Sequence, residues 1–175
     1  MEIPETTDRI RFRPYRRDDA RFVSNMFRDA QAGRFYPGMS DPEKADGWIE
    51  WIMDSYITHG FWLWVIEHRD QGWFLGDCGL SYQLVEGRRW LEVGYHLSAQ
   101  FRGKGYATEA ARACVTHAFS QVAAQRVCSI VDPTNTPSSR VASRIHNSSR
   151  VLTDVGTGVR LLFWSGVWPN GTEDP

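Results

Sequence analysis

A carboxylate and an imidazole lie four residues apart at Glu92 and His96, in a segment that alternates apolar and polar residues. This alternation predicts a strand over Arg89 to Leu97. Because every second side chain shares a face of a strand, Glu92 and His96 should point the same way, away from the apolar face that carries Tyr95. A pair of this kind can take a proton from an attacking nucleophile. Glu92 is the first candidate for a general base, directly or through water, and His96 is the second.

Both candidates also have plainer explanations, which the sequence leaves open. Glu92 could form a salt bridge to Arg88 or Arg89, and this explanation carries about equal weight. For His96, a structural histidine packed beneath a ligand is the favoured explanation. The strand therefore indicates a proton-transfer site, but it does not decide whether Glu92 or His96 transfers the proton.

The predicted strand leads through a short glycine-containing loop, Gln100 to Gly105, into a helix predicted over Tyr106 to Gln121. Glycines let a backbone approach a ligand closely, and the first N–H groups of a helix attract an anion. Two common phosphate-binding patterns fail here. A Walker A loop needs Lys and then Ser or Thr after its second glycine, and a dinucleotide fingerprint needs Gly or Ala where Thr108 stands.

The loop instead fits the pattern Q/R-x-x-G-x-G/A, read here as Gln100-Phe101-Arg102-Gly103-Lys104-Gly105. A second stretch, Asn135-Thr136-Pro137-Ser138, lies downstream and is followed by Arg140-Val141-Ala142. Together these stretches resemble the GNAT superfamily of N-acetyltransferases, and in particular the branch that acetylates ribosomal-protein N-termini (RimJ/RimL-like). The resemblance covers nearly the whole chain, from Ile10 to Trp164.

The resemblance implies a set of site residues and acetyl-CoA as co-substrate, with no metal. Backbone groups of His96 and Leu97 would bond the pantetheine arm, and N–H groups from about Arg102 to Ala107 would hold the pyrophosphate. Ser138 matches the family serine that protonates the thiolate, although its position also suits a helix N-cap. The expected catalytic residues are Glu92, Ser138 and His96. The expected cofactor-binding residues are His96, Leu97, Gln100, Arg102, Gly103, Lys104, Gly105, Tyr106, Ala107 and Asn135.

Two positions depart from the family pattern. Many of these enzymes place a general-acid tyrosine seven residues after the asparagine, where this chain has Ala142. The family also usually has a glycine eight residues beyond the serine, where this chain has His146. The first departure leaves no tyrosine acid at that position, and the second puts the local turn in question.

The composition is that of an ordinary globular chain: 175 residues, 42% hydrophobic, 23% charged, with a net charge of -1. We expect a single domain over residues 1–175, with a structured core of about 9–168. The charge balance indicates no nucleic-acid partner and no membrane partner. The start of the chain lacks the features of a signal peptide, so the expected location is cytoplasmic. The three cysteines indicate neither a disulfide framework nor a zinc site.

The element order reads as strand, two helices, three strands, helix, strand, helix and two strands. This order predicts an α/β (α+β) fold, here the GNAT fold: a mixed, mostly antiparallel sheet splayed after the fourth strand, with four helices. Residues Gly33 to Ser40 are expected to form a loop. Gly156-Thr157-Gly158 should turn the last hairpin.

The leading hypothesis is an N-acetyltransferase that moves an acetyl group from acetyl-CoA to a primary amine by direct attack. The amine acceptor would be a protein or peptide N-terminus or a small-molecule amine. A non-catalytic, regulatory CoA-binding module is the alternative. The acceptor site should come from Gln31 to Gly60 and the last hairpin, with Arg34, Phe35, Tyr36, Trp48 and Trp51 as lining or core. The family often forms dimers, so a homodimer is also considered.

Overall fold

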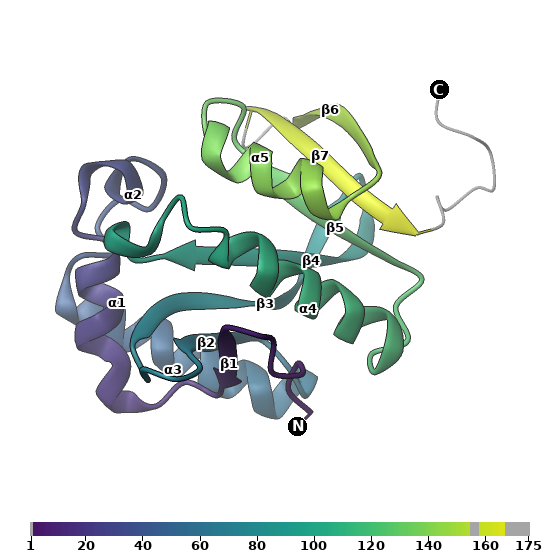
Figure 1. Cartoon of the computed structure of the whole chain (residues 1–175). Coiled ribbons are helices and arrows are strands. Elements are labelled where there is room, and N and C mark those ends of the chain that lie inside the picture. Colours follow the sequence, from purple (N-terminus) through teal and green to yellow (C-terminus); the bar gives the residue numbers. More distant parts are fainter. Residues whose placement is uncertain (1, 155–157, 167–175) are drawn as a thin grey trace.

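The computed structural model describes residues 2–154 and 158–166, which form a layered α/β fold (Figure 1). The strands are β1 (Ile10–Arg13), β2 (Leu63–His68), β3 (Phe74–Val85), β4 (Arg88–Leu97), β5 (Arg126–Val131), β6 (Ser148–Asp154) and β7 (Gly158–Gly166). The α-helices are α1 (Ala20–Met26), α2 (Ala30–Phe35), α3 (Pro42–His59), α4 (Tyr106–Ser120) and α5 (Thr136–Ile145). No helix within the described ranges is long and apolar enough to cross a bilayer.

The seven strands form one sheet in the order β1-β2-β3-β4-β5-β7-β6. Every neighbouring pair is antiparallel except β4 and β5, which are parallel. These two strands pair only at Leu91 with Val127 and at Glu92 with Cys128. Residues 93–97 of β4 therefore continue without a β5 partner. The predicted splay after the fourth strand is confirmed (Figure 1).

The described chain has five α-helices, one more than predicted. The additional helix is α2, whose second half occupies the start of the segment expected to be a loop. It forms because the Asp29 side chain caps it, accepting hydrogen bonds from the N–H groups of Gln31 and Ala32. The expected hairpin turn includes residues 156 and 157, which lie outside the described residues.

Helices cover both faces of the sheet, and β2 shows how the faces are divided. Trp64 and Ile66 pack in the hydrophobic cluster that includes α4, while Leu63 and Val65 pack in the cluster that includes α1 and α3. Helix α4 buries a row of small side chains against the sheet: Ala110, Ala111, Cys114 and Ala118. Small side chains let the helix lie close to the strands, as predicted from its spacing.

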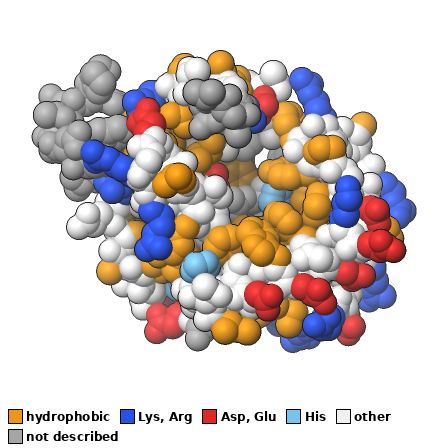
Figure 2. Space-filling model, turned by 180° about the vertical axis from the view of Figure 1, so that it is seen from behind, with side chains coloured by type: hydrophobic (Ala, Val, Ile, Leu, Met, Phe, Trp, Pro, Cys, Tyr) orange, Lys and Arg blue, Asp and Glu red, His pale blue; other side chains and the backbone are white. Residues whose placement is uncertain are grey.

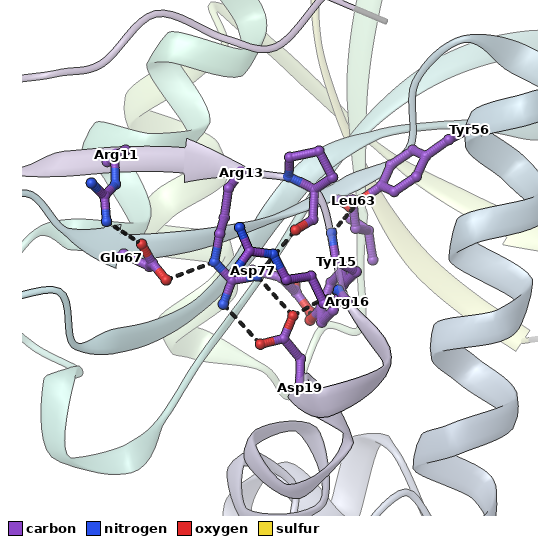
Figure 3. Close-up of polar contacts among 10 residues, drawn as sticks. Arg11, Arg13, Tyr15, Arg16, Asp19, Tyr56, Leu63, Glu67 and Asp77 are labelled. Atoms are coloured by element: carbon purple, nitrogen blue, oxygen red, sulfur yellow. Dashed lines mark hydrogen bonds and ion pairs between the residues drawn. The ribbon is translucent and has the colours of Figure 1, made fainter.

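A polar cluster joins the end of β1 to the elements packed around it (Figure 3). The Arg13 guanidinium bonds Asp19 at 2.7 Å and Glu67 at 2.6 Å. The Tyr56 hydroxyl accepts from the Tyr15 N–H and donates to the carbonyl of Leu63. Because the Tyr15 backbone is held in this way, its hydroxyl is directed into the sheet, toward Asp77.

Candidate active site

Two cavities meet where β4 and β5 diverge. The larger, of about 480 Å³, lies between the end of β4, the start of α4, α5 and α2. The smaller, of about 210 Å³, is bounded by β4, β5 and α3 and by the segment that follows α3. Both cavities are lined by Tyr36, Tyr95, His96 and Ser138. A ligand in one cavity can therefore reach a ligand in the other through the gap in the sheet.

The glycine loop opens into the larger cavity through Gly103 and Gly105, which have φ of 75° and 87°. These left-handed conformations favour glycine. Gly105 is the N-cap residue of α4, and no side chain caps that helix. The first N–H groups of α4, which as in any helix lack an intrahelical acceptor, therefore also lack a capping side chain, and together with the helix dipole they form an anion site.

The side chain of Arg102, which lines the larger cavity, is held by an ion pair with Asp29. Its guanidinium makes two hydrogen bonds to the Asp29 carboxylate, at 2.9 and 2.8 Å, and donates to the carbonyl of Leu97. The hydrogen bonds from Arg102 lower the pKa of Asp29. Arg102 therefore ties the start of α2 to the loop, and α2 forms one wall of the larger cavity.

Two cations that the sequence analysis did not assign line the larger cavity, Arg140 and Arg144. They stand one turn apart on α5, so their side chains share a helix face. Their spacing of four residues was a visible signal, but only the fold places this face opposite the start of α4. Together they give the cavity positive charge suited to phosphate groups.

Most of the expected cofactor-binding residues line the larger cavity: His96, Leu97, Arg102, Gly103, Gly105, Ala107 and Asn135. Gln100, Lys104 and Tyr106 are not part of its lining. Tyr106 is buried beneath the guanidinium of Arg9, and the Lys104 ammonium lies 5.7 Å from the centre of the Phe101 ring. Asn135, rather than Ser138, is the N-cap of α5, and its side chain accepts from the Ser138 N–H.

Glu92 lines the smaller cavity. One carboxylate oxygen accepts from the Ile130 N–H at 3.1 Å, and the other lies 3.5 Å from the Ser81 hydroxyl. Burial raises the pKa of Glu92 to about 7, so near neutral pH it exists in both protonation states. Arg88 and Arg89 were considered as salt-bridge partners of Glu92. The guanidinium of Arg89 instead lies over the ring of Tyr82.

His96 lines both cavities and is held by a buried carboxylate. Its Nδ1 lies 2.6 Å from Asp77 Oδ1, and the Tyr15 hydroxyl donates to Asp77 Oδ2 at 2.7 Å. Because Asp77 can only accept when ionised, Nδ1 carries the proton and Nε2 is the basic nitrogen. The sequence analysis missed Asp77, which stands 19 residues earlier and meets His96 through the register of β3 and β4.

A tyrosine hydroxyl lies at the junction of the cavities. Tyr95 packs against the core, as its place on the strand predicted, and it also lines both cavities. The Tyr95 hydroxyl donates to the Ser138 carbonyl at 2.9 Å and accepts from the Ser138 hydroxyl at 3.2 Å. Burial raises the pKa of Tyr95 to about 12, so it keeps its proton at neutral pH. Tyr95 thus supplies a hydroxyl that the buried Ala142 cannot.

The comparison with protein families decides the assignment. The family described as "Acetyltransferase (GNAT) domain" matches residues 9–147. The chain belongs to the GNAT acetyltransferase family. This GNAT protein is accordingly an acyltransferase enzyme, as the sequence analysis predicted.

Two Bacillus subtilis proteins and a solved structure are similar to this GNAT chain. The Bacillus subtilis (strain 168) protein YkkB is 36% identical over 140 residues, which cover 79% of this chain and 81% of YkkB. The N-acetyltransferase YoaA of the same organism is 27% identical over 137 residues, which cover 77% of each chain. The RimL ribosomal L7/L12 alpha-N-protein acetyltransferase, solved in complex with coenzyme A, shares the fold. Its TM-score is 0.75 at 16% identity, over 95% of this chain and 98% of that one.

The second departure from the GNAT pattern, His146, is accommodated without strain. It follows α5 with φ of -117°, an extended conformation that needs no glycine. Its ring bridges two strands, with Nε2 3.1 Å from the Ser129 hydroxyl and Nδ1 3.2 Å from the Ser165 hydroxyl. The histidine therefore fastens the end of α5 to β5 and β7.

Proposed function

We propose that this GNAT enzyme transfers the acetyl group of acetyl-CoA to a primary amine by direct attack. The observation that carries the proposal is the meeting of two cavities at the splay. One presents an uncapped helix N-terminus and two arginines, and the other presents Glu92. Their shared wall holds His96 and Tyr95, so groups that move protons stand between the two binding sites.

The larger cavity fits coenzyme A in its chemistry. Its pyrophosphate would lie against the N–H groups at the start of α4, and Arg140 and Arg144 would supply counter-charge. Backbone groups at the unpaired end of β4, including His96 and Leu97, would bond the pantetheine arm. The thioester supplies the acetyl group. RimL, which shares the fold, was solved in complex with coenzyme A, and this supports coenzyme A as the ligand.

Glu92 and His96 are the proposed acceptors of the amine proton. An amine in the smaller cavity can lose its proton to Glu92, directly or through a water molecule, or to His96 Nε2. As the new C–N bond forms and the C–S bond breaks, the leaving thiolate takes a proton from Ser138 or Tyr95. Asp77 is a positioning residue in this scheme, because it fixes the tautomer of His96.

The test is acetyl-CoA binding by calorimetry to a Gly103→Glu, Gly105→Glu variant. Two carboxylates at the start of α4 should repel the pyrophosphate and reduce affinity at least about a hundredfold. A Gly60→Glu, Gly87→Glu variant is the matched control, since both glycines also have positive φ and open surroundings. The control should bind like the wild type. A folded wild type that binds no acetyl-CoA would overturn the proposal.

A further inference from the structure

The smaller cavity has an aromatic wall on the side of α3. Trp48 and Trp51 stand three residues apart on that helix, with ring centres 5.4 Å apart. The Trp51 ring meets the Trp62 ring edge-on at 4.9 Å, and Trp51 remains 48% exposed. A half-exposed tryptophan beside a cavity presents a ring face to an occupant. Figure 2 shows hydrophobic side chains gathered around a hollow on the face of the molecule opposite to that of Figure 1.

The charged residues that line the smaller cavity also limit which ligands it can hold. Glu92 is the one acidic side chain in its described lining, and no lysine or arginine contributes to that lining. The next carboxylate, Asp77, is fully buried and already accepts from Tyr15 and His96. One ammonium group can therefore be neutralised. A carboxylate on the same ligand, or a second ammonium, would enter without a partner.

The volume limits the occupant further. At about 210 Å³ the cavity is smaller than the roughly 300 Å³ at the lower end for drug-sized ligands. It suits an amine with one short side arm, and the tryptophan rings favour an arm that is flat and apolar. A ring can stack on Trp48 or Trp51 while the amine nitrogen approaches Glu92 and the junction with the larger cavity.

We propose that the acceptor is a small arylalkylamine, a primary amine with one positive charge and an aromatic ring, held by the Trp48–Trp51 wall with its nitrogen at Glu92. This inference rests on the proposed acetyl transfer. The ammonium first loses one proton to Glu92 or His96, which frees the lone pair of its nitrogen. As that nitrogen bonds the acetyl carbon it loses a second proton, the C–S bond breaks, and the thiolate is protonated, so one proton passes to solvent overall. The products are the N-acetyl arylalkylamine and free CoA.

The experiment measures CoA release at saturating acetyl-CoA with four probes: tryptamine, spermidine, glycine and an alanine-initiated tetrapeptide. Tryptamine should have a kcat/KM at least about tenfold above the other three. Trp51→Leu should raise the KM for tryptamine about tenfold, since it removes a ring face from the cavity. Trp73→Leu is the control, because Trp73 is also half-exposed but lines neither cavity. It should leave that KM unchanged.

The outcomes separate this inference from the proposed function. Higher kcat/KM for spermidine, glycine or the peptide would overturn the arylalkylamine proposal while supporting amine acetylation. An unchanged tryptamine KM in a folded Trp51→Leu variant would also overturn it. Calorimetric binding of acetyl-CoA and the melting temperature show whether each variant is folded. If the wild type binds acetyl-CoA but none of the four probes releases CoA, the arylalkylamine proposal fails, whereas the proposed acetyl transfer fails if a folded wild type binds no acetyl-CoA.

Discussion

Glu92 and His96 face the same cavity but are held in different ways. The carboxylate of Glu92 has a backbone N–H and a nearby hydroxyl as partners, and burial disfavours its charged form. The imidazole of His96 is oriented by a buried acid that is itself bonded to Tyr15. The surroundings of Glu92 thus set its pKa, whereas the surroundings of His96 set the orientation of its ring. Each arrangement leads to a different kinetic expectation.

Glu92→Gln should lower kcat/KM for the amine about a hundredfold, the usual effect of losing a general base. The wild-type value should rise with pH through about 7, as Glu92 ionises, and this rise should vanish in the variant. Because the folded pKa is raised above 4.5, ionisation of Glu92 also reduces wild-type stability as pH rises from 4.5 to 7. Pre-steady-state acetyl transfer would measure the first effect and chemical denaturation the second.

Glu50→Gln provides the control for this comparison, since Glu50 is exposed on α3 and pairs with Arg17. It should keep the wild-type pH profile. A Glu92→Gln enzyme that retained the rise near pH 7 would show that another group is the base.

Asp77→Asn should lower kcat about tenfold or more while leaving the KM for acetyl-CoA near the wild-type value. The amide can donate to Nδ1, which then carries no proton, and so favour the tautomer of His96 that is protonated at Nε2. Comparison of kcat with KM, together with the imidazole resonances in NMR spectra, checks this expectation. Equal losses in kcat and in the melting temperature, with an unchanged histidine tautomer, would make Asp77 a purely structural residue.

At the scale of elements, the sequence predicts most of what local pattern and glycine placement control. Strand alternation located β4, and the two glycines marked the loop before α4, because both signals lie within a few residues. The sequence analysis missed α2, which depends on the cap at Asp29. It placed Tyr95 correctly on the core face but did not predict that the Tyr95 hydroxyl also reaches the site. Tyr95 reaches the site only because β4 and β5 diverge, and no local pattern encodes that divergence.

The bridge that His146 makes from α5 to β5 and β7 predicts an acid-sensitive junction. Burial lowers the pKa of His146 from 6.5 to about 4, so the folded protein resists protonation that the unfolded chain accepts. Stability from this residue is therefore full above pH 6.5 and is lost as pH falls toward 4. The loss is about 3 kcal/mol, since each pKa unit is worth about 1.4 kcal/mol.

Denaturation of wild type and His146→Gln at pH 7 and pH 4.5 would measure this contribution, because shared groups cancel in the difference. At pH 7 the variant should have a lower free energy of unfolding than the wild type. This difference in free energy should be smaller at pH 4.5. His59→Gln, an exposed histidine on α3, is the control. A difference of constant size at both pH values would contradict the assignment.

At the scale of the whole molecule, the backbone ladder of the described sheet is narrowest at the β4–β5 seam, although side chains pack across it. Trp90 of β4 packs in one cluster with Cys128 and Trp164, and Val127 of β5 packs in the cluster that holds α4. Only two paired positions join β4 to β5. A ligand in the larger cavity would contact both sides, from α4 to α5.

Hydrogen exchange should reveal this narrow seam. Amides of β5 and α5 in the free protein should exchange faster than those of β3, because the seam can open without global unfolding. Saturating acetyl-CoA should slow exchange on both sides. Mass spectrometry of peptides from residues 126–145 and 74–85 would measure the difference, and equal rates in the free protein would contradict it.

The narrow β4–β5 seam also makes the lifetime of the protein depend on the concentration of acetyl-CoA. A ligand that binds only the closed form stabilises it by about 2.7 kcal/mol at a hundred times its Kd. Proteases cut chains that open, so cleavage should slow when acetyl-CoA is plentiful and quicken when it is scarce. The amount of enzyme in a cell would then follow the supply of acetyl groups, without any dedicated regulatory site.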